Sequence, residues 1–114
     1  MYDTNNVFAK ILRGEIPARK IYENEYALAF HNIAPKAETH VLVIPKGEFI
    51  NLADFTEHAT AEQTRGFWDA VHATATAMGI GHEFRISANS GGYQSVMHFH
   101  IHILNDDKFK TDGL

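Results

Sequence analysis

The fold is decided by the stretch Met97-His98-Phe99-His100-Ile101-His102-Ile103-Leu104, in which histidine alternates with phenylalanine or isoleucine. Strict alternation is typical of a half-buried β-strand, whose successive side chains point to opposite faces. We therefore predict that the histidines share one face, in a row about 13 Å long. The apolar residues, Met97 included, are expected to anchor the other face in a core. Such a row of imidazoles indicates a site, whereas a single histidine on a strand would not.

The composition limits the possible classes of protein. At 114 residues, with 45% hydrophobic and 21% charged residues, the chain is expected to form one soluble domain over residues 1–114, with residues 105–114 as a C-terminal tail. The net charge of −4 argues against general nucleic-acid binding. Without cysteine, the chain has neither disulfides nor a thiolate zinc site. The polar N-terminus and the lack of a long apolar run predict a cytoplasmic protein without a membrane segment.

The remaining secondary structure is predicted from periodicity and from capping residues. A short helix is expected over residues 7–12, ending at Gly14, and a long helix begins after the capping box of Thr60 and Gln63 and ends at Gly79. Besides the histidine stretch at 97–104, strands are expected near residues 21–22, 26–31, 40–44 and 83–88. Residues 48–59 show no clean period, and only a helical turn or two is expected at 50–55. This order predicts an α+β fold around an antiparallel sheet of about five strands, with one long and one short helix.

Two further features of the sequence bear on a site. A glycine-rich polar loop, Asn89-Ser90-Gly91-Gly92-Tyr93-Gln94-Ser95, leads directly into the histidine stretch. Taken alone, such a loop is more often a hairpin turn, but beside a row of histidines its flexible backbone amides favour phosphate binding. His40, which opens a separate strand, is a candidate fourth imidazole at the same site.

Two chemistries are compatible with these residues. In the first, a neutral imidazole attacks phosphorus and forms a phospho-histidine that water later hydrolyses, while the neighbouring histidines hold oxygens and manage protons. In the second, two alternate histidines and a third ligand such as His40 bind zinc or another transition metal. No carboxylate flanks the row as a general base or partner for a metal site, which favours the first chemistry.

The histidine stretch resembles the His-x-His-x-His-x-x motif of the histidine triad (HIT) family. Further matches to its Hint-type nucleotide-binding branch occur in the same order along the chain. They are Asn6-Val7-Phe8-Ala9-Lys10-Ile11, Gly14-Glu15-Ile16-Pro17-Ala18, Leu28-Ala29-Phe30-His31-Asn32-Ile33, Pro35, Thr39-His40-Val41-Leu42-Val43-Ile44-Pro45-Lys46 and Gln94-Ser95-Val96. The resemblance covers about residues 5–104.

The resemblance implies a HIT-like fold, a homodimer, and a purine-nucleotide (AMP- or GMP-type) substrate. It implies hydrolysis of nucleoside 5′-monophosphate phosphoramidates or related mixed linkages through a nucleotidyl-histidine, with no cofactor and no metal. His100 would be the nucleophile, His102 would contact the phosphate, and His98 and His40 would orient groups and relay protons. Ser95 would lie near the leaving group and Asn89 near the phosphate or ribose. The walls of the base pocket would be Phe8, Ile11, Phe30 and Ile33.

The chain departs from the family pattern in three places. Asn32 stands where the branch usually has the Asp that accepts from the ribose hydroxyls. The loop over residues 89–95 is about two residues shorter than in the family, and Asn105-Asp106-Asp107 replaces a glycine-rich continuation. Because of these departures, a second function remains an alternative: a nucleotide-binding regulatory protein with weak catalysis. The sequence names neither the physiological substrate nor any protein partner.

Overall fold

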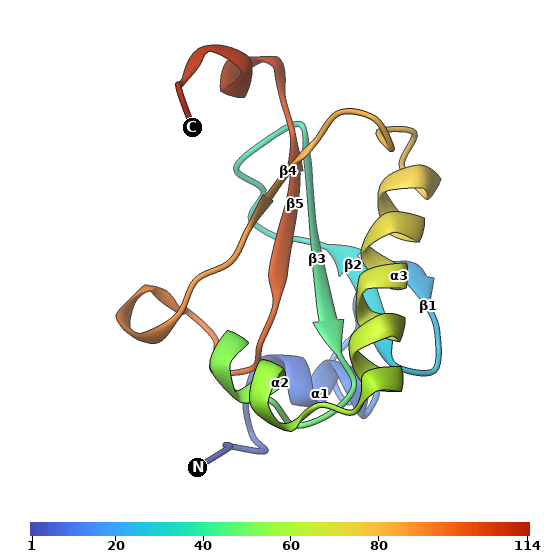
Figure 1. Cartoon of the computed structure of the whole chain (residues 1–114), viewed down its shortest axis with the longest axis vertical. Coiled ribbons are helices and arrows are strands. Elements are labelled where there is room, and N and C mark those ends of the chain that lie inside the picture. Colours follow the sequence, from blue (N-terminus) through green and yellow to red (C-terminus); the bar gives the residue numbers. More distant parts are fainter.

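An antiparallel sheet of five strands, in the order β1-β2-β3-β5-β4, forms the frame of the molecule (Figure 1). The computed structural model describes all of residues 1–114. The strands are β1 (Lys20–Glu23), β2 (Ala27–His31), β3 (Thr39–Pro45), β4 (Arg85–Ser87) and β5 (Ile101–Asn105). The helices are α1 (Val7–Leu12), α2 (Leu52–His58) and α3 (Ala61–Ala77), with 3₁₀ turns at Gly91–Tyr93 and Asp107–Thr111. The predicted α+β fold with about five strands is confirmed.

The helix ends follow the capping signals in the sequence. The capping box at the start of α3 is present, since the Thr60 side chain accepts from the backbone N–H of Gln63 and the Gln63 side chain accepts from that of Thr60. Gly14 and Gly79 follow α1 and α3 with φ of 77° and 76°, a left-handed conformation that glycine adopts without strain. The prediction of only two helices is incomplete, because residues 52–58 form α2, which buries Phe55 in the core.

The predictions for β4 and β5 were too long. Only residues 85–87 of the predicted strand at 83–88 pair with β5, and its apolar side chains Phe84 and Ile86 remain 36% and 44% exposed. The histidine stretch becomes a strand only at Ile101, whose partner on β3 is Val43. Before that point the Phe99 N–H donates to the carbonyl of Phe49 in a loop, and Met97 is 43% exposed instead of buried. The β3–β5 ladder stops at Val43, and Pro45, which would lie opposite Phe99 in this register, has no N–H with which to continue it.

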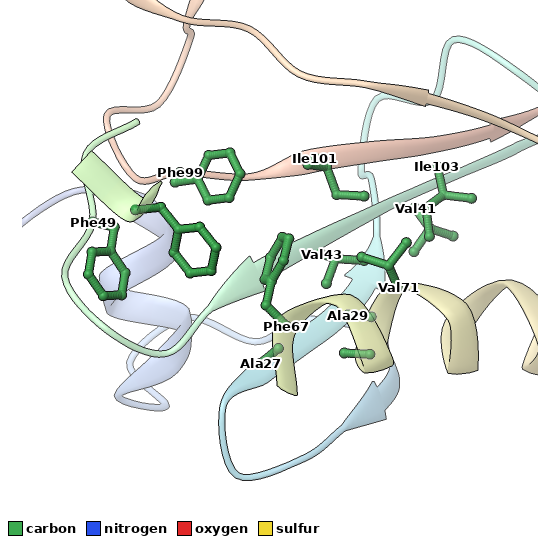
Figure 2. Packing of buried hydrophobic residues seen from close by; sticks show 12 residues of the cluster. Ala27, Ala29, Val41, Val43, Phe49, Phe67, Val71, Phe99, Ile101 and Ile103 are labelled. Atoms are coloured by element: carbon green, nitrogen blue, oxygen red, sulfur yellow. The ribbon is translucent and has the colours of Figure 1, made fainter. Parts of the chain in front are cut away.

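Both faces of the sheet are covered, but unequally. On one face, Val41 and Val43 of β3 and Ile101 and Ile103 of β5 pack with Phe67 and Val71 of α3 in a continuous core (Figure 2). On the other face a smaller cluster joins Phe8 and Ile11 of α1 to Leu28, Phe30, Leu42 and Ile44 of the sheet. Because α1 is only six residues long, it leaves part of this face uncovered.

The C-terminal tail folds back onto β4. The Arg85 guanidinium donates to both oxygens of the Asp112 carboxylate, at 2.7 and 2.8 Å, and lies over the Phe109 ring. This bidentate pair lowers the pKa of Asp112 to about 2. The expected loose tail is therefore partly ordered. No helix of the protein is both long and apolar enough to cross a bilayer.

Candidate functional site

Strand register brings two of the predicted site histidines together. His102 lies opposite Leu42, and His40 lies opposite Leu104, so both imidazoles project from the same face of the β3–β5 pair. Their rings are 5.1 Å apart between centroids, with His40 Nε2 2.8 Å from His102 Nδ1. His100, just before β5, places its ring 5.2 Å from that of His102. His40, His100 and His102 therefore form one cluster.

A cavity of about 290 Å³ opens beside this cluster, on the face that α1 covers incompletely. All but one of the residues that the sequence predicted to bind a nucleotide line it, namely Phe8, Ile11, Phe30, Asn32, Ile33, Ser95, His100 and His102. The remaining walls are Val7, Ile16, Pro17, Ala18, His31, Leu42 and Val96. The exception is Asn89, which is half-buried outside the lining. The cavity thus combines apolar walls with three histidines, of which His100 and His102 belong to the cluster.

His98 differs from His100 and His102 because it does not line the cavity. It is fully buried, with its Nε2–H donating to the carbonyl of Pro45 at 2.8 Å and the Tyr2 hydroxyl donating to its Nδ1 at 2.5 Å. The Phe8 ring makes edge contacts with the rings of both His98 and His100. His98 therefore joins the N-terminal segment to the end of β3. Burial lowers its pKa to about 4, so its ring is neutral at neutral pH.

The proton on His100 can be located from its backbone partner. His100 Nδ1 lies 2.8 Å from the carbonyl oxygen of His98, which can only accept, so Nδ1 carries the proton. In a neutral imidazole, Nε2 then has a free lone pair. Burial lowers the pKa of His100, and its side chain, only 4% exposed, is accordingly uncharged at neutral pH. This combination makes Nε2 of His100 available as a nucleophile.

The protons on His40 and His102 follow by the same argument. The backbone N–H of Lys36 donates to His40 Nδ1 at 2.9 Å, so the proton of neutral His40 is on Nε2. His40 Nε2–H then donates to His102 Nδ1, which leaves the proton of His102 on its own Nε2. Burial is the main cause of a lowered pKa in both His40 and His102, and the pKa of His102 falls to about 4. The pair therefore presents one N–H donor at the cavity.

Asn32 lies beside this pair without competing for its proton. Its side-chain oxygen accepts from the Ala34 N–H at 2.8 Å, and its NH₂ lies 3.2 Å from His40 Nε2. Because both of these nitrogens carry hydrogen, the contact is not a productive hydrogen bond. The proton of His40 is consequently directed to His102 alone.

Several functional contacts were missed from the sequence. The histidine rings are held by the Tyr2 hydroxyl, the Lys36 amide and the Pro45 carbonyl. The amide and the carbonyl are backbone groups, which no sequence pattern identifies. Tyr2 stands in a polar N-terminal segment that gave no periodic signal. The described side chains include no group of three or more His, Cys, Asp or Glu residues arranged to hold a metal ion.

The chain is similar to known proteins over most of its length. A family profile described as "HIT domain" matches residues 13–109. A 13.2 kDa HIT-like protein of Azospirillum brasilense is 50% identical over 105 residues, which span 90% of this chain and 86% of the relative. The solved structure of a HIT family hydrolase from Clostridium thermocellum matches with a TM-score of 0.85 and 33% identity, over 96% of this chain and 97% of that one. That of a HIT family hydrolase from Legionella pneumophila gives a TM-score of 0.78 and 36% identity, over 89% and 92% of the two chains.

Proposed function

The chain belongs to the HIT family and is similar to HIT hydrolases, and from this premise we propose that it hydrolyses nucleoside 5′-monophosphate phosphoramidates or related mixed linkages. The observation that carries the proposal is the free Nε2 lone pair of buried His100, which lines an apolar cavity. A neutral, desolvated imidazole with its other nitrogen held by a carbonyl is suited to attack an electrophilic phosphorus.

The proposed reaction has two displacements at phosphorus. His100 Nε2 attacks the phosphorus, the bond from phosphorus to the leaving nitrogen breaks, and that nitrogen takes a proton from solvent and departs as the amine. The enzyme then carries a nucleotidyl group on His100. Water attacks the same phosphorus and gives up a proton to solvent, the bond to His100 breaks, and the nucleoside monophosphate is released with neutral His100 restored.

The neighbouring residues are assigned to charge stabilisation and orientation. The Nε2–H of His102 donates to a phosphoryl oxygen, and His40 keeps that proton in place by donating to His102 Nδ1. His98 orients the nucleophile through its carbonyl. Ser95 is exposed and lines the cavity, consistent with a hydroxyl near the leaving group. We keep Asn89 as a contact to phosphate or ribose, although it lies outside the cavity lining of the free protein.

The apolar walls support a purine nucleotide as substrate. Phe8 and Phe30 form an edge-to-face pair with centroids 5.6 Å apart, and Ile11 and Ile33 also line the cavity. Ile33 is 99% exposed in the free protein, and a bound base would cover it. Planar aromatic ligands gain from such walls, while the histidines provide the polar contacts.

The test is intact-protein mass spectrometry after brief mixing with an adenosine phosphoramidate. We expect an added nucleotidyl group on the wild-type protein and none on His100→Ala, whereas His98→Ala retains some adduct and turns over more slowly. An adduct mapped to another residue, or no hydrolysis by the wild type, would refute the proposal. Binding of AMP without turnover would favour the regulatory alternative.

We also propose that the protein is a homodimer. β4 is an edge strand with unpaired backbone groups, and its Ile86 side chain is 44% exposed. On α3, Trp68 is 41% exposed. The exposed Ile86 at an unpaired sheet edge and the exposed Trp68 on α3 are each consistent with burial against a second copy.

A further inference from the structure

The segment between β2 and β3, residues 32–38, has few contacts of its own but controls the proton of His40. Its residues from Ile33 to Lys36 are exposed, as is Glu38, so hydrophobic packing does not fix its position. The segment nevertheless provides the Lys36 N–H that donates to His40 Nδ1. It also carries Asn32 and Ile33 in the cavity wall. A second element must therefore hold this segment in place.

Asp106 is the residue that ties the segment to β5. The β3–β5 ladder ends at the pair Thr39–Asn105, and the Asp106 carboxylate continues it by accepting from the Glu38 N–H at 3.0 Å. Its other oxygen accepts from the Lys108 N–H at 3.1 Å. These backbone donors lower the pKa of Asp106, whose side chain is only 14% exposed. Lys108 adds a second tie, since its ammonium donates to the Lys36 carbonyl at 2.9 Å.

We propose that Asp106, with Lys108, is a positioning residue that holds residues 36–38 so that the Lys36 amide fixes the tautomer of His40. The contacts form a closed ring from His102 through His40, Lys36, Glu38 and Asp106 back along β5. This role rests on the proposed function for its effect on catalysis, but the tautomer itself is a property of the free protein.

The mechanism of the effect is a change in where protons reside. With the segment in place, His40 carries its proton on Nε2 and His102 carries its own on Nε2 beside the cavity. When the Lys36 amide moves away, His40 Nδ1 is free to take a proton, and Nε2 then has nothing to donate to His102. His102 Nδ1 next takes the proton of its ring, and the donor to the phosphoryl oxygen is lost.

The primary experiment reads the tautomers directly. ¹⁵N–¹H correlation spectra of the imidazoles, recorded at neutral pH without ligand, should show Nε2–H for His40 and His102 in the wild type. In Asp106→Ala we expect a mixture of tautomers at both residues. Asp106→Asn, which retains one acceptor oxygen, should give an intermediate mixture, and Lys108→Met a smaller change. Asp107→Asn is the matched control, because it removes one charge at the next position and Asp107 is 94% exposed.

Kinetics with an adenosine phosphoramidate then separate this role from the function as a whole. Asp106→Ala should lower kcat/KM about tenfold, the effect of losing one hydrogen bond to a charged group. Asp107→Asn should match the wild type. If the wild type hydrolyses the substrate but the Asp106 variants keep both the wild-type tautomers and the wild-type rate, the positioning role is wrong. If no protein hydrolyses it, the proposed function fails, while the spectra still decide the tautomer claim.

Discussion

Replacing Tyr2 by Phe tests how the buried His98 is held. The change removes one hydroxyl and keeps the ring that makes an edge contact with His98. Burial raises the pKa of Tyr2, so its hydroxyl is protonated and donates to His98 Nδ1 at neutral pH. Since His98 Nε2–H is already bound to Pro45, no other group satisfies Nδ1. Leaving a buried acceptor unpaired costs about 1–3 kcal/mol of folding free energy.

The assay is urea and thermal unfolding at one fixed protein concentration, because an oligomer would make the midpoint concentration-dependent. For a domain of this size, about 1 kcal/mol corresponds to about 4 °C in Tm. Tyr93→Phe is the matched control, since its ring is 85% exposed and should lose almost nothing. Equal stability of Tyr2→Phe and Tyr93→Phe would refute the claim that Tyr2 satisfies His98.

The stability difference between wild type and Tyr2→Phe should also depend on pH, which a simple loss of packing would not cause. The pKa of His98 is about 4 in the folded protein against an ordinary value near 6.5, so its contribution to stability is complete above about pH 6.5. It is lost as the pH falls from about 6.5 towards 4, by about 3 kcal/mol for this residue. The Tyr2 hydroxyl favours the neutral ring, and without it the folded pKa rises. The stability difference between wild type and Tyr2→Phe should therefore narrow as the pH falls through this window, and a constant difference would contradict the hydrogen bond.

Three further outcomes are expected. Asn32→Asp should tighten AMP binding several-fold more than deoxy-AMP binding, because a carboxylate accepts from both ribose hydroxyls more strongly than an amide. Equal changes in the calorimetric affinity for both nucleotides would exclude a ribose contact. Hydrolysis should survive EDTA, and loss of activity that one added metal restores would revive the metalloenzyme alternative. Light scattering at micromolar concentration should give a homodimer, and a mass near one 12.8 kDa chain would contradict the proposed interface.

Much of the fold was predictable because it depends on patterns that single residues carry. The capping box at Thr60 and Gln63 and the glycine after α3 fix the ends of the long helix wherever it packs. By contrast, α2 has no clear period because only Phe55 enters the core, so its helix depends on tertiary packing. The alternation from Met97 to Leu104 predicted a continuous strand, but alternation cannot show where the neighbouring strand ends. The pairing stops at Val43 and Ile101, and the Phe99 N–H donates to the Phe49 carbonyl instead.

Because the sequence does not show where strand pairing stops, it predicted which residues form the candidate site but not the role of each one. The family resemblance identified the histidines, yet the three members of the row have different surroundings because the row begins before β5 does. Main-chain groups place the protons of three of the four rings: the carbonyl of Pro45 for His98, that of His98 for His100, and the amide of Lys36 for His40. The proton of His102 is placed in turn by the ring of His40. Any amino acid other than proline supplies such an amide, so a substitution there that keeps the backbone in place should preserve the tautomer. The side chains that do matter are therefore those that position the backbone, which is why Asp106, remote from the cavity, is expected to affect the proton of His102.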